Sequence, residues 1–456
     1  MKKKIIVLFL VVFLVGVGTV ATLWKQNPTN KNNSTLVSGS DNSAVGFFYF
    51  GGYEQLDPAL FKTAYVRVGI DWNDFEPQEG NFVFDQQNSQ ALKIDQLLAE
   101  GKKIVPSIRS RSLWAVPKTK EKCASSPIDL NTKMALKKGV SYSDTYYNFV
   151  KNIAEHYKGK FEIVVIENEM NDNDFWCSSA NDYLRLFLTA KKAFEDVDPA
   201  VKLADGGIQG AALNWLVIED YLANQDVAAT SFYEKFTGEQ ITKTELVKES
   251  KKHTLKEWVK PAQQLFDSQL FEWVDVVNFH YYQKPEALPE IVAYLRKNIP
   301  PGKMLMTNEV GMKERFSNSP DAASQEMIKK YAYLLSLRVN PILWFSPGGK
   351  EDNNAGALID EKGQIVEETK NSFEAVARFL GKNGTACQDV STLEVAKFTC
   401  QNQTEKVDVL WAKNKNSSTK IKIEPNCSVY NHQNQAITSA EISLATEPIF
   451  ITCSLP

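Results

Sequence analysis

The sequence lacks the short motifs that identify several large classes of enzymes and metal-binding proteins. It contains four histidines in 456 residues, with neither an HExxH motif nor a histidine pair at ligand spacing. A GxGxxG loop, a phosphate-binding GxxxxGKS or GxxxxGKT loop, a GxSxG motif and the EF-hand pattern are also missing. These absences count against a zinc protease, a nucleotide-binding open sheet, a serine hydrolase and a calcium sensor. We therefore expect no metal and no cofactor.

A large excess of charge of either sign is also absent. The chain has 52 basic and 55 acidic residues and a net charge of −3. Proteins that bind duplex nucleic acid normally carry a basic excess, so we expect no nucleic-acid partner. The apolar fraction of 43% and the charged fraction of 23% exclude a collagen, a coiled coil, a disordered tail and a protein with many membrane spans. Aromatic residues make up 11% of the chain, which suits a large core or a sugar-stacking cleft equally.

One long apolar run is present, and it lies at the N-terminus. Ile5–Trp24 follows the basic MKKK and is closed by Lys25. A helix of this length spans about 30 Å, the thickness of a bilayer core. Residues 1–25 are thus a membrane anchor, which we favour, or a signal peptide cleaved after Thr19–Ala21. Either way the rest of the chain is expected outside the cytoplasm, after a polar, flexible tether at 26–43.

Cysteine usage agrees with an exported protein. No CxxC pair is present, which argues against a zinc knuckle or a thioredoxin motif. An even number of cysteines on an exported chain favours disulfides, with some free thiols as the alternative. The six candidates are Cys123, Cys177, Cys387, Cys400, Cys427 and Cys453. The last four allow three pairings, of which sequence neighbours (387 with 400, 427 with 453) are the simplest, and the first two lie in long loops and can join each other.

Strand-like and helix-like segments alternate between residues 44 and 382. Eight apolar, β-branched runs are separated by stretches with helical spacing, which favours a closed (β/α)8 barrel (a TIM barrel) over an open doubly wound sheet. The predicted strands are Val45–Phe50, Ala64–Ile70, Lys103–Arg109, Glu162–Glu167, Val201–Asp205, Val274–His280, Lys303–Glu309 and Pro341–Ser346. Extra helices are expected at about 210–270. Residues 386–456 instead contain short period-two runs between polar clusters, which predicts a small antiparallel β domain, sandwich-like in form.

Polar side chains gather where the predicted barrel strands end. In a (β/α)8 barrel the reactive groups lie at the carboxyl ends of the strands. The candidates there are Arg67, Trp114, Asn168, Glu169, His280, Tyr282, Glu309 and Trp344.

Two of these candidates, Glu169 and Glu309, are expected to face each other across the barrel mouth. Cleavage of an acetal needs one carboxylic acid to protonate the leaving oxygen and a second carboxylate to attack or stabilise the sugar cation. A separation of about 5–5.5 Å gives retention of configuration through a covalent intermediate. Nearby arginine and tyrosine side chains would keep the nucleophile ionised.

The motifs around these residues resemble those of clan A glycoside hydrolases, most closely families 39 and 42, or family 5. They are VRVGIDW with EPQEGNFVFD on the second strand, the Asn168-Glu169 dipeptide on the fourth and His280 with Tyr282 on the sixth. TNEVG around Glu309 follows on the seventh strand, and Trp344 lies on the eighth. Each motif alone is weak, but five in this order, each at a strand end, are specific together. A small β domain after the barrel also suits family 39.

The resemblance implies a role for each candidate residue. Glu169 would be the general acid/base and Glu309 the nucleophile, with Asn168 on the sugar 2-hydroxyl. Arg67 and Tyr282 would contact Glu309. The subsite for the reacting sugar would be lined by His280, Trp114 and Trp344.

Two departures from the family pattern stand beside the acid/base. Glu167 occupies a position where many relatives have Trp, and Met170 one where Pro is common. Glu167 is therefore a second candidate for the acid. The sequence predicts an exported retaining hydrolase that cleaves β-glycosidic bonds of an oligo- or polysaccharide. The alternative is a cell-surface barrel that binds a polysaccharide without cleaving it.

Overall fold

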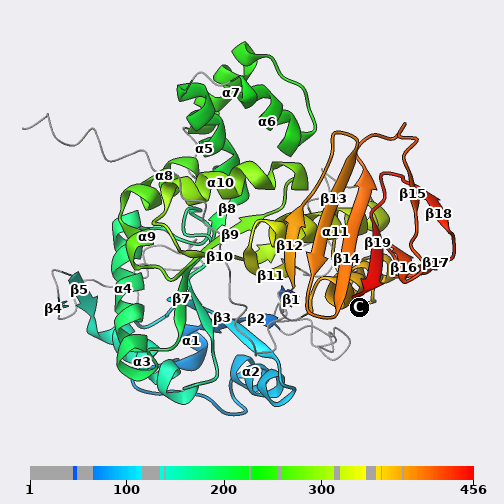
Figure 1. The fold of residues 1–456 in the computed structure, drawn as a ribbon. Helices are drawn as coiled ribbons and strands as arrows, with labels where there is room; N and C mark the ends of the chain where they lie inside the picture. The colour runs from blue at the N-terminus through cyan, green and yellow to red at the C-terminus, as the bar shows by residue number, and fades with distance from the viewer. Residues whose placement is uncertain are drawn as a thin grey trace, which may run out of the picture. The chain divides into compact units, whose positions relative to one another are not determined.

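Figure 1 presents the fold as a computed structural model of the chain. The residues it describes are 45–48, 65–115, 134–137, 140–224, 227–254, 258–312, 319–345, 356–360, 362–382 and 385–455. The predicted anchor or signal peptide at 1–25, the predicted tether at 26–43 and Cys123 lie outside these ranges. Within them, no helix is both long enough and apolar enough to cross a membrane.

Eight parallel strands form a closed barrel in the described part of the chain. Each strand pairs with the next one, and the last pairs with the first, so the sheet has no free edge. The strands are β1 (Val45–Phe48), β2 (Tyr65–Asp71), β3 (Lys103–Arg109), β6 (Ile163–Ile166), β7 (Lys202–Asp205), β9 (Val276–Tyr281), β10 (Met304–Val310) and β11 (Val339–Phe345). The prediction of a (β/α)8 barrel is confirmed.

Apolar side chains fill the barrel on both faces of its strands. One small cluster contains side chains from seven different strands, including Val105, Val165, Met306 and Leu343, which places it in the barrel interior. A larger cluster lies between the strands and the surrounding helices. These helices are α2 (Ser89–Ala99), α3 (Asp144–His156), α4 (Ala180–Val197), α10 (Leu288–Asn298), α11 (Pro320–Ser336) and α12 (Glu367–Phe379). Because both faces of the strands are buried, they read as near-continuous apolar runs in the sequence.

The helix α4 illustrates how the sequence sets the boundaries of an element. Ser179 accepts a hydrogen bond from the backbone N–H of Asp182, and the carboxylate of Asp182 accepts one from the backbone N–H of Ser179. This capping box fixes the start of the helix. Tyr183 and Phe187 are then buried one turn apart, as expected for a helix that covers a sheet.

An insertion separates β7 from β9. It contains β8 (Ile208–Gln209), α5 (Gly210–Ala223), α6 (Ala228–Thr237), α7 (Lys243–Thr254), α8 (Val259–Asp267) and α9 (Leu270–Trp273). Figure 1 shows α5, α6 and α7 projecting from the barrel at the top of the view. The insertion has its own aromatic packing, in which the ring of His253 stacks 3.9 Å from that of Trp215. Asn171 Nδ2 donates to Trp258 O at 3.0 Å, which ties the insertion to the loop after β6. A hairpin of β4 (Met134–Lys137) and β5 (Val140–Ser143) was not predicted.

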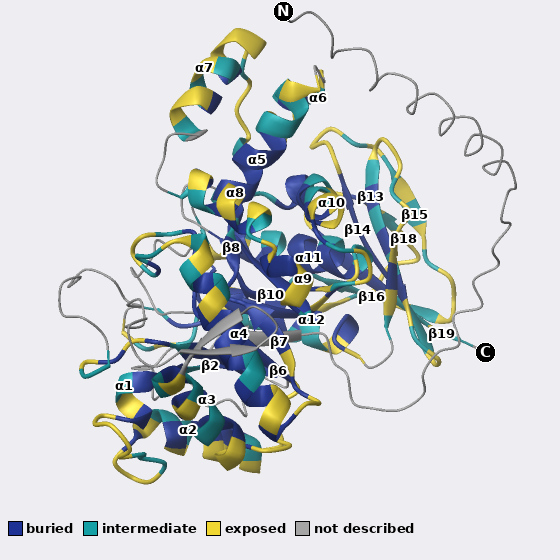
Figure 2. Ribbon diagram, turned by 90° about the vertical axis from the view of Figure 1, so that its left-hand side faces the viewer, coloured by how far each residue is buried: buried dark blue, intermediate teal, exposed yellow. Residues whose placement is uncertain are grey.

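The C-terminal segment forms an antiparallel β domain that packs on the barrel, as predicted (Figure 2). Its main sheet has the order β12 (Ala386–Asp389), β13 (Val395–Gln401), β14 (Glu405–Ala412), β19 (Ile449–Ser454), β16 (Cys427–Asn431) and β17 (Ala436–Ile437). The strands β15 (Lys420–Lys422) and β18 (Glu441–Ser443) pair separately. Aromatic contacts join the domain to the barrel helices: Tyr333 of α11 meets Phe398 at 4.7 Å, and Phe379 of α12 meets Phe450 at 4.8 Å.

Two disulfides each join directly opposed residues on neighbouring strands of this domain. They are Cys387–Cys400 and Cys427–Cys453, the pairs of sequence neighbours. Cys177 is also disulfide-bonded. The prediction that its partner is Cys123 lies outside the described residues.

Candidate active site

Six of the eight predicted site residues meet at the carboxyl ends of four barrel strands. Arg67 comes from β2, Asn168 and Glu169 from the turn after β6, His280 and Tyr282 from β9 and its end, and Glu309 from β10. All six side chains are buried.

The turn after β6 holds Glu169 in an unusual backbone conformation. Glu167 and Glu169 have φ values of 70° and 38°, in the left-handed region that side chains other than glycine seldom adopt. Backbone hydrogen bonds hold the turn, from Glu167 N to Ile108 O at 2.8 Å and from Glu169 N to Gly206 O at 2.9 Å. The Glu167 carboxylate accepts from Ser110 N at 2.7 Å. Glu167 thus anchors the turn to β3, and strain of this kind persists where the surroundings over-determine it.

Glu309 is a buried carboxylate with strong partners on both oxygens. Arg67 Nη1 lies 2.6 Å from Oε2, and the hydroxyl of Tyr282 donates to Oε1 at 2.7 Å. Burial alone would raise the pKa of Glu309. The positive charges of His280 and Arg67, with the hydrogen bonds from Tyr282 and Arg67, outweigh burial and hold that pKa below its usual range. Glu309 is therefore ionised at neutral pH.

Glu169 has a different set of partners. Its Oε1 lies 2.8 Å from His280 Nδ1, and its Oε2 accepts from Gln209 Nε2 at 2.7 Å. His280 Nδ1 also lies 3.5 Å from a Glu309 oxygen, so the imidazole stands between the two carboxylates. An oxygen of Glu169 and an oxygen of Glu309 lie within 4.8 Å of each other.

A pair of asparagines fixes the tautomer of His280. The backbone N–H of Asn308 donates to Asn278 Oδ1 at 3.0 Å, which leaves Asn278 Nδ2 to donate to Asn308 Oδ1 at 2.7 Å. Asn308 Oδ1 is thus an acceptor, so His280 Nε2, 2.9 Å away, carries a hydrogen. One proton then lies between His280 Nδ1 and Glu169, either as imidazolium beside carboxylate or as imidazole beside carboxylic acid.

The surroundings of His280 favour its protonated form. Burial alone would lower the pKa of His280. The negative charge of Glu309, followed by the hydrogen bond and charge of Glu169, raises that pKa above its ordinary value despite the opposing charge of Arg67.

Asn168 is oriented by the same arginine that holds Glu309. Its Oδ1 accepts from Arg67 Nη2 at 2.6 Å, while Arg67 Nε donates to Ser107 Oγ at 3.1 Å. Because Oδ1 accepts from Arg67, the other end of the Asn168 side chain is its amide NH2 group, a hydrogen-bond donor.

Each of the two predicted tryptophans donates a hydrogen bond to a backbone carbonyl. Trp114 is half-buried, and its Nε1 donates to Glu76 O at 2.8 Å while its ring packs edge-to-face on Trp72. Trp344 has a relative exposure of 0%, and its Nε1 donates to Gly356 O at 2.8 Å. Protein atoms cover the Trp344 ring, so it offers no open face to a sugar in this structure.

Four residues of the site were missed from the sequence. They are Gln209, which bonds Glu169, the pair Asn278 and Asn308, and the buried Asp205 of β7, which accepts from Asn278 N at 2.8 Å. A signal was present for the two asparagines, because a lone amide in an otherwise apolar strand needs a buried partner.

The trio of Glu169, His280 and Glu309 has the side-chain types of a metal site, with one possible ligand atom of each within 4.8 Å of the others. Its partners do not fit a divalent cation. His280 Nε2 carries a hydrogen, and Nδ1 is engaged with Glu169. The guanidinium of Arg67 already neutralises Glu309 at 2.6 Å. The arrangement is suited to holding and moving a proton.

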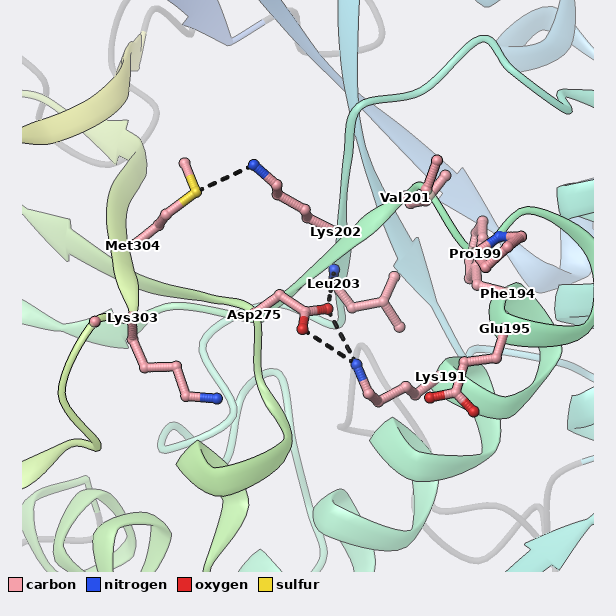
Figure 3. Close-up of a pocket in the computed structure, with 12 residues that line it drawn as sticks. Lys191, Phe194, Glu195, Pro199, Val201, Lys202, Leu203, Asp275, Lys303 and Met304 are labelled. Atoms are coloured by element: carbon pink, nitrogen blue, oxygen red, sulfur yellow. Dashed lines mark hydrogen bonds and ion pairs between the residues drawn. The ribbon is translucent and has the colours of Figure 1, made fainter. Parts of the chain in front are cut away.

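A separate hollow of about 440 Å³ lies at the opposite end of the barrel (Figure 3). It is lined by residues near the amino ends of β7, β9 and β10. Lys191 pairs there with Asp275 at 3.1 Å, and Lys202 Nζ lies 3.4 Å from Met304 Sδ. In this barrel fold the amino ends of the strands serve stability, so the hollow is not part of the candidate site.

Comparisons with known proteins agree with the fold. No family model matches the chain, and no curated protein matches its sequence. Among solved structures, a family 39 glycoside hydrolase from Bacteroides cellulosilyticus WH2 is similar with a TM-score of 0.61 and 12% identity, over 91% of this chain and 81% of that one. A family 30 endoxylanase from Clostridium papyrosolvens C71 is similar with a TM-score of 0.54 and 13% identity, over 92% of this chain and 98% of that one. A β-xylosidase from Caulobacter crescentus CB15 is similar with a TM-score of 0.52 and 11% identity, over 91% of this chain and 97% of that one. The chain therefore has the barrel fold of clan A glycoside hydrolases.

Proposed function

We propose that this protein is a retaining hydrolase of β-glycosidic bonds, with Glu309 as nucleophile and Glu169 as general acid/base. The observation that carries the proposal is the asymmetry of two carboxylates less than 5 Å apart. One of them, Glu309, is neutralised by an arginine and stays ionised, whereas the other shares a proton with His280. A nucleophile needs the first environment and an acid/base needs the second.

In the first step, an oxygen of Glu309 forms a bond to the anomeric carbon while the bond to the leaving oxygen breaks. The leaving oxygen takes the proton held between Glu169 and His280. The closest oxygens of the two carboxylates lie within 4.8 Å, which fits direct attack better than the 6.5–9.5 Å that leaves room for a water in inverting enzymes. The amide of Asn168 is placed to donate to a sugar hydroxyl.

In the second step, water attacks the anomeric carbon and Glu309 leaves as a carboxylate. The proton of the water returns to the pair of Glu169 and His280. The same pair therefore acts as acid and then as base, as microscopic reversibility requires. Gln209 Nε2 donates to Glu169 Oε2 at 2.7 Å and so holds the carboxyl group in place for this transfer.

The substrate proposed is a β-linked oligo- or polysaccharide outside the cytoplasm. Two of the similar structures are an endoxylanase and a β-xylosidase, so β-xylosides head the panel of substrates to test. The disulfides of the β domain suit an oxidising compartment, which supports export through residues 1–25 as an anchor or signal peptide.

The test is hydrolysis of aryl β-glycosides by the wild type and by Glu309→Gln, with the configuration of the first product followed by NMR. We expect a β-configured first product from the wild type and loss of turnover in the variant. Glu162→Gln is a matched control, because Glu162 precedes the amino end of β6 and pairs with Lys103. An α-configured first product would refute retention. Binding of a polysaccharide without cleavage by the wild type would favour the non-catalytic alternative.

A further inference from the structure

Asp205 is a fully buried carboxylate beside the site that the proposed reaction does not use. It is the last residue of β7. Its Oδ1 accepts from the backbone N–H of Asn278 at 2.8 Å, and its Oδ2 accepts from the backbone N–H of Gly207 at 3.1 Å. Its own carbonyl accepts from Asn278 Nδ2 at 3.2 Å. Asp205 thus joins the end of β7 to β9, two residues before His280.

The turn that follows Asp205 lies between Glu169 and His280. Gly206 O accepts from the backbone N–H of Glu169 at 2.9 Å. A Cβ atom built on Gly206 would stand 3.0 Å from the backbone N of Asn168. Gly207 has φ +91°, and a Cβ atom there would stand 2.3 Å from His280 Nε2. The two glycines let this turn touch the backbone of the acid/base on one side and the imidazole on the other.

We infer that Asp205 is a positioning residue: its carboxylate fastens the Gly206–Gly207 turn to β9 and thereby holds His280 against Glu169. The expected effect of Asp205 on activity rests on the proposed function. The placement of His280 is a property of the folded chain, and it can be measured without a substrate.

The chemistry of the contact requires a carboxylate at this position. Both oxygens of Asp205 accept from backbone N–H groups, so an asparagine would turn its NH2 group towards one of two donors. One hydrogen bond would be lost, and a buried N–H of Asn278 or Gly207 would remain without an acceptor. An alanine would lose both bonds.

The charge of Asp205 also acts on His280. The charged groups around His280 are Glu169 at the end of β6, Glu309 on β10 and Arg67 on β2, with Asp205 on β7. The charge of His280 attracts the carboxylate of Asp205, and this attraction is mutual. An ionised Asp205 therefore stabilises the imidazolium form of His280.

The protonation of the Asp205 carboxyl also bears on these hydrogen bonds. Burial raises its pKa to about 7, against the hydrogen bonds from Asn278 and Gly207 and the charge of His280. Tyr183 of α4 faces it from the outer side, and the pKa of Tyr183 is raised by burial and by Asp205. The ionised carboxylate is the stronger acceptor, so its hydrogen bonds from Asn278 and Gly207 strengthen as the pH rises through about 7.

The test uses Asp205→Asn in the full chain, with Asp198→Asn as the matched control. Asp198 is also buried, and it also accepts from a backbone N–H, that of Gly159, at 2.7 Å. It follows the C-terminus of α4 and, within the described part of the chain, has no contact with the Gly206–Gly207 turn. Histidine labelled with 15N gives direct access to His280, because the chain has four histidines, and His280→Gln assigns its signals. We expect His280 to titrate at lower pH in Asp205→Asn and to be unchanged in Asp198→Asn.

Activity supplies the second readout. Asp205→Asn should lower kcat/KM, which reports the first step, by about 10- to 100-fold on aryl glycosides with poor leaving groups, because the acid is misplaced, and far less on activated ones. If Asp205→Asn does not fold, Gly207→Ala tests the same contact by pressing on the His280 ring, with Gly159→Ala as its control.

The inference is overturned if the His280 signals in Asp205→Asn match those of the wild type. It is also overturned if the loss of activity does not depend on the leaving group. An inactive wild type would instead contradict the proposed function, and the NMR result would then still decide the role of Asp205.

Discussion

His280 Nδ1 lies 2.8 Å from Glu169 Oε1, with both side chains buried at the mouth of the barrel. Because the other ring nitrogen of His280 is committed to Asn308, this contact holds one proton that either partner can carry. Glu309, within 4.8 Å of this pair, has oxygens that accept from Arg67 and Tyr282, and His280 Nδ1 lies farther from it, at 3.5 Å. The different roles proposed for the two carboxylates are argued from these neighbours.

The two carboxylates should respond differently to the leaving group. Glu309→Ala should reduce turnover of every substrate by about 10⁴-fold or more, because no covalent intermediate can form. Glu169→Ala should lower kcat/KM, which reports the first step, by about 10²- to 10⁴-fold on glycosides with poor leaving groups and much less on activated phenols. Kinetics with a series of aryl glycosides measures both effects.

Azide gives an independent check on the same assignment. It should rescue Glu169→Ala with a β-glycosyl azide, because azide attacks the covalent intermediate, and Glu309→Ala with the α-azide, because azide attacks the sugar directly. Full activity of Glu169→Ala on natural glycosides would make Glu167 the next candidate for the acid.

Removing Arg67 should destabilise the fold as well as disturb Glu309, the proposed nucleophile. Its guanidinium and the carboxylate of Glu309 form a buried pair at 2.6 Å, and loss of one partner leaves an uncompensated buried charge. We expect Arg67→Met to lower the free energy of unfolding by about 3–5 kcal/mol. Urea unfolding at pH 7 measures the change.

Arg109→Met is the control for that experiment. Arg109 pairs with Asp71 at 2.5 Å, and the two side chains are 31% and 16% exposed, more than those of Arg67 and Glu309 at 4% and 10%. Gln90 Nε2 also donates to the Asp71 carboxylate at 2.8 Å, so that carboxylate keeps a partner when Arg109 is removed. Equal losses in the two variants would show that the burial of Glu309 does not set the cost.

The fold could be predicted from the apolar runs that form the strands, and the site from the charged residues at the ends of those runs. Lys103–Arg109 and Val201–Asp205 read as strands because runs of apolar residues suit burial on both faces. Glu169 and Glu309 stand at the ends of such runs. In a (β/α)8 barrel the ends of the strands meet at the barrel mouth, so these two charged side chains are expected there.

The contacts around those charges could not be predicted in the same way. His280 meets Glu169 across 111 residues of sequence, and Asn278 meets Asn308 across 30. Such contacts depend on strand tilt and stagger, which local patterns do not encode. Trp344 illustrates the same limit, because whether its ring faces the cleft or Tyr331 depends on packing across the barrel wall.

The two disulfides of the β domain should differ in their contribution to stability. Their cysteines are separated by 13 and 26 residues, so loop-closure entropy predicts about 3 kcal/mol for Cys387–Cys400 and about 3.5 kcal/mol for Cys427–Cys453. Thermal unfolding of the two double Cys→Ser variants measures the contributions. A larger loss for Cys387–Cys400 would contradict the entropic account.

His280 and His156 should give pH dependences of opposite sign. The pKa of His280 is raised, since the charge of Glu309 and the contact with Glu169 outweigh burial. The stability this adds is fully present below the unfolded pKa of about 6.5 and is lost as the pH rises through the higher folded value. The pKa of His156 is lowered by burial, so its neutral form is favoured in the fold and the stability it adds is lost as the pH falls.

The experiment is urea unfolding of the wild type, His280→Gln and His156→Gln at pH 6 and pH 9. His280→Gln should cost more stability at pH 6, where the wild type carries an imidazolium between two carboxylates. His156→Gln should cost more at pH 9, where the wild-type ring is neutral and stacks 3.9 Å from Phe84. The packing losses of the two variants differ, because His280 is buried and His156 is exposed. Each packing loss is the same at both pH values, so the sign of the pH effect within each variant isolates the charge. A His280→Gln cost that is equal or greater at pH 9 would mean that His280 is not the proton carrier, and Glu169 would then act without it.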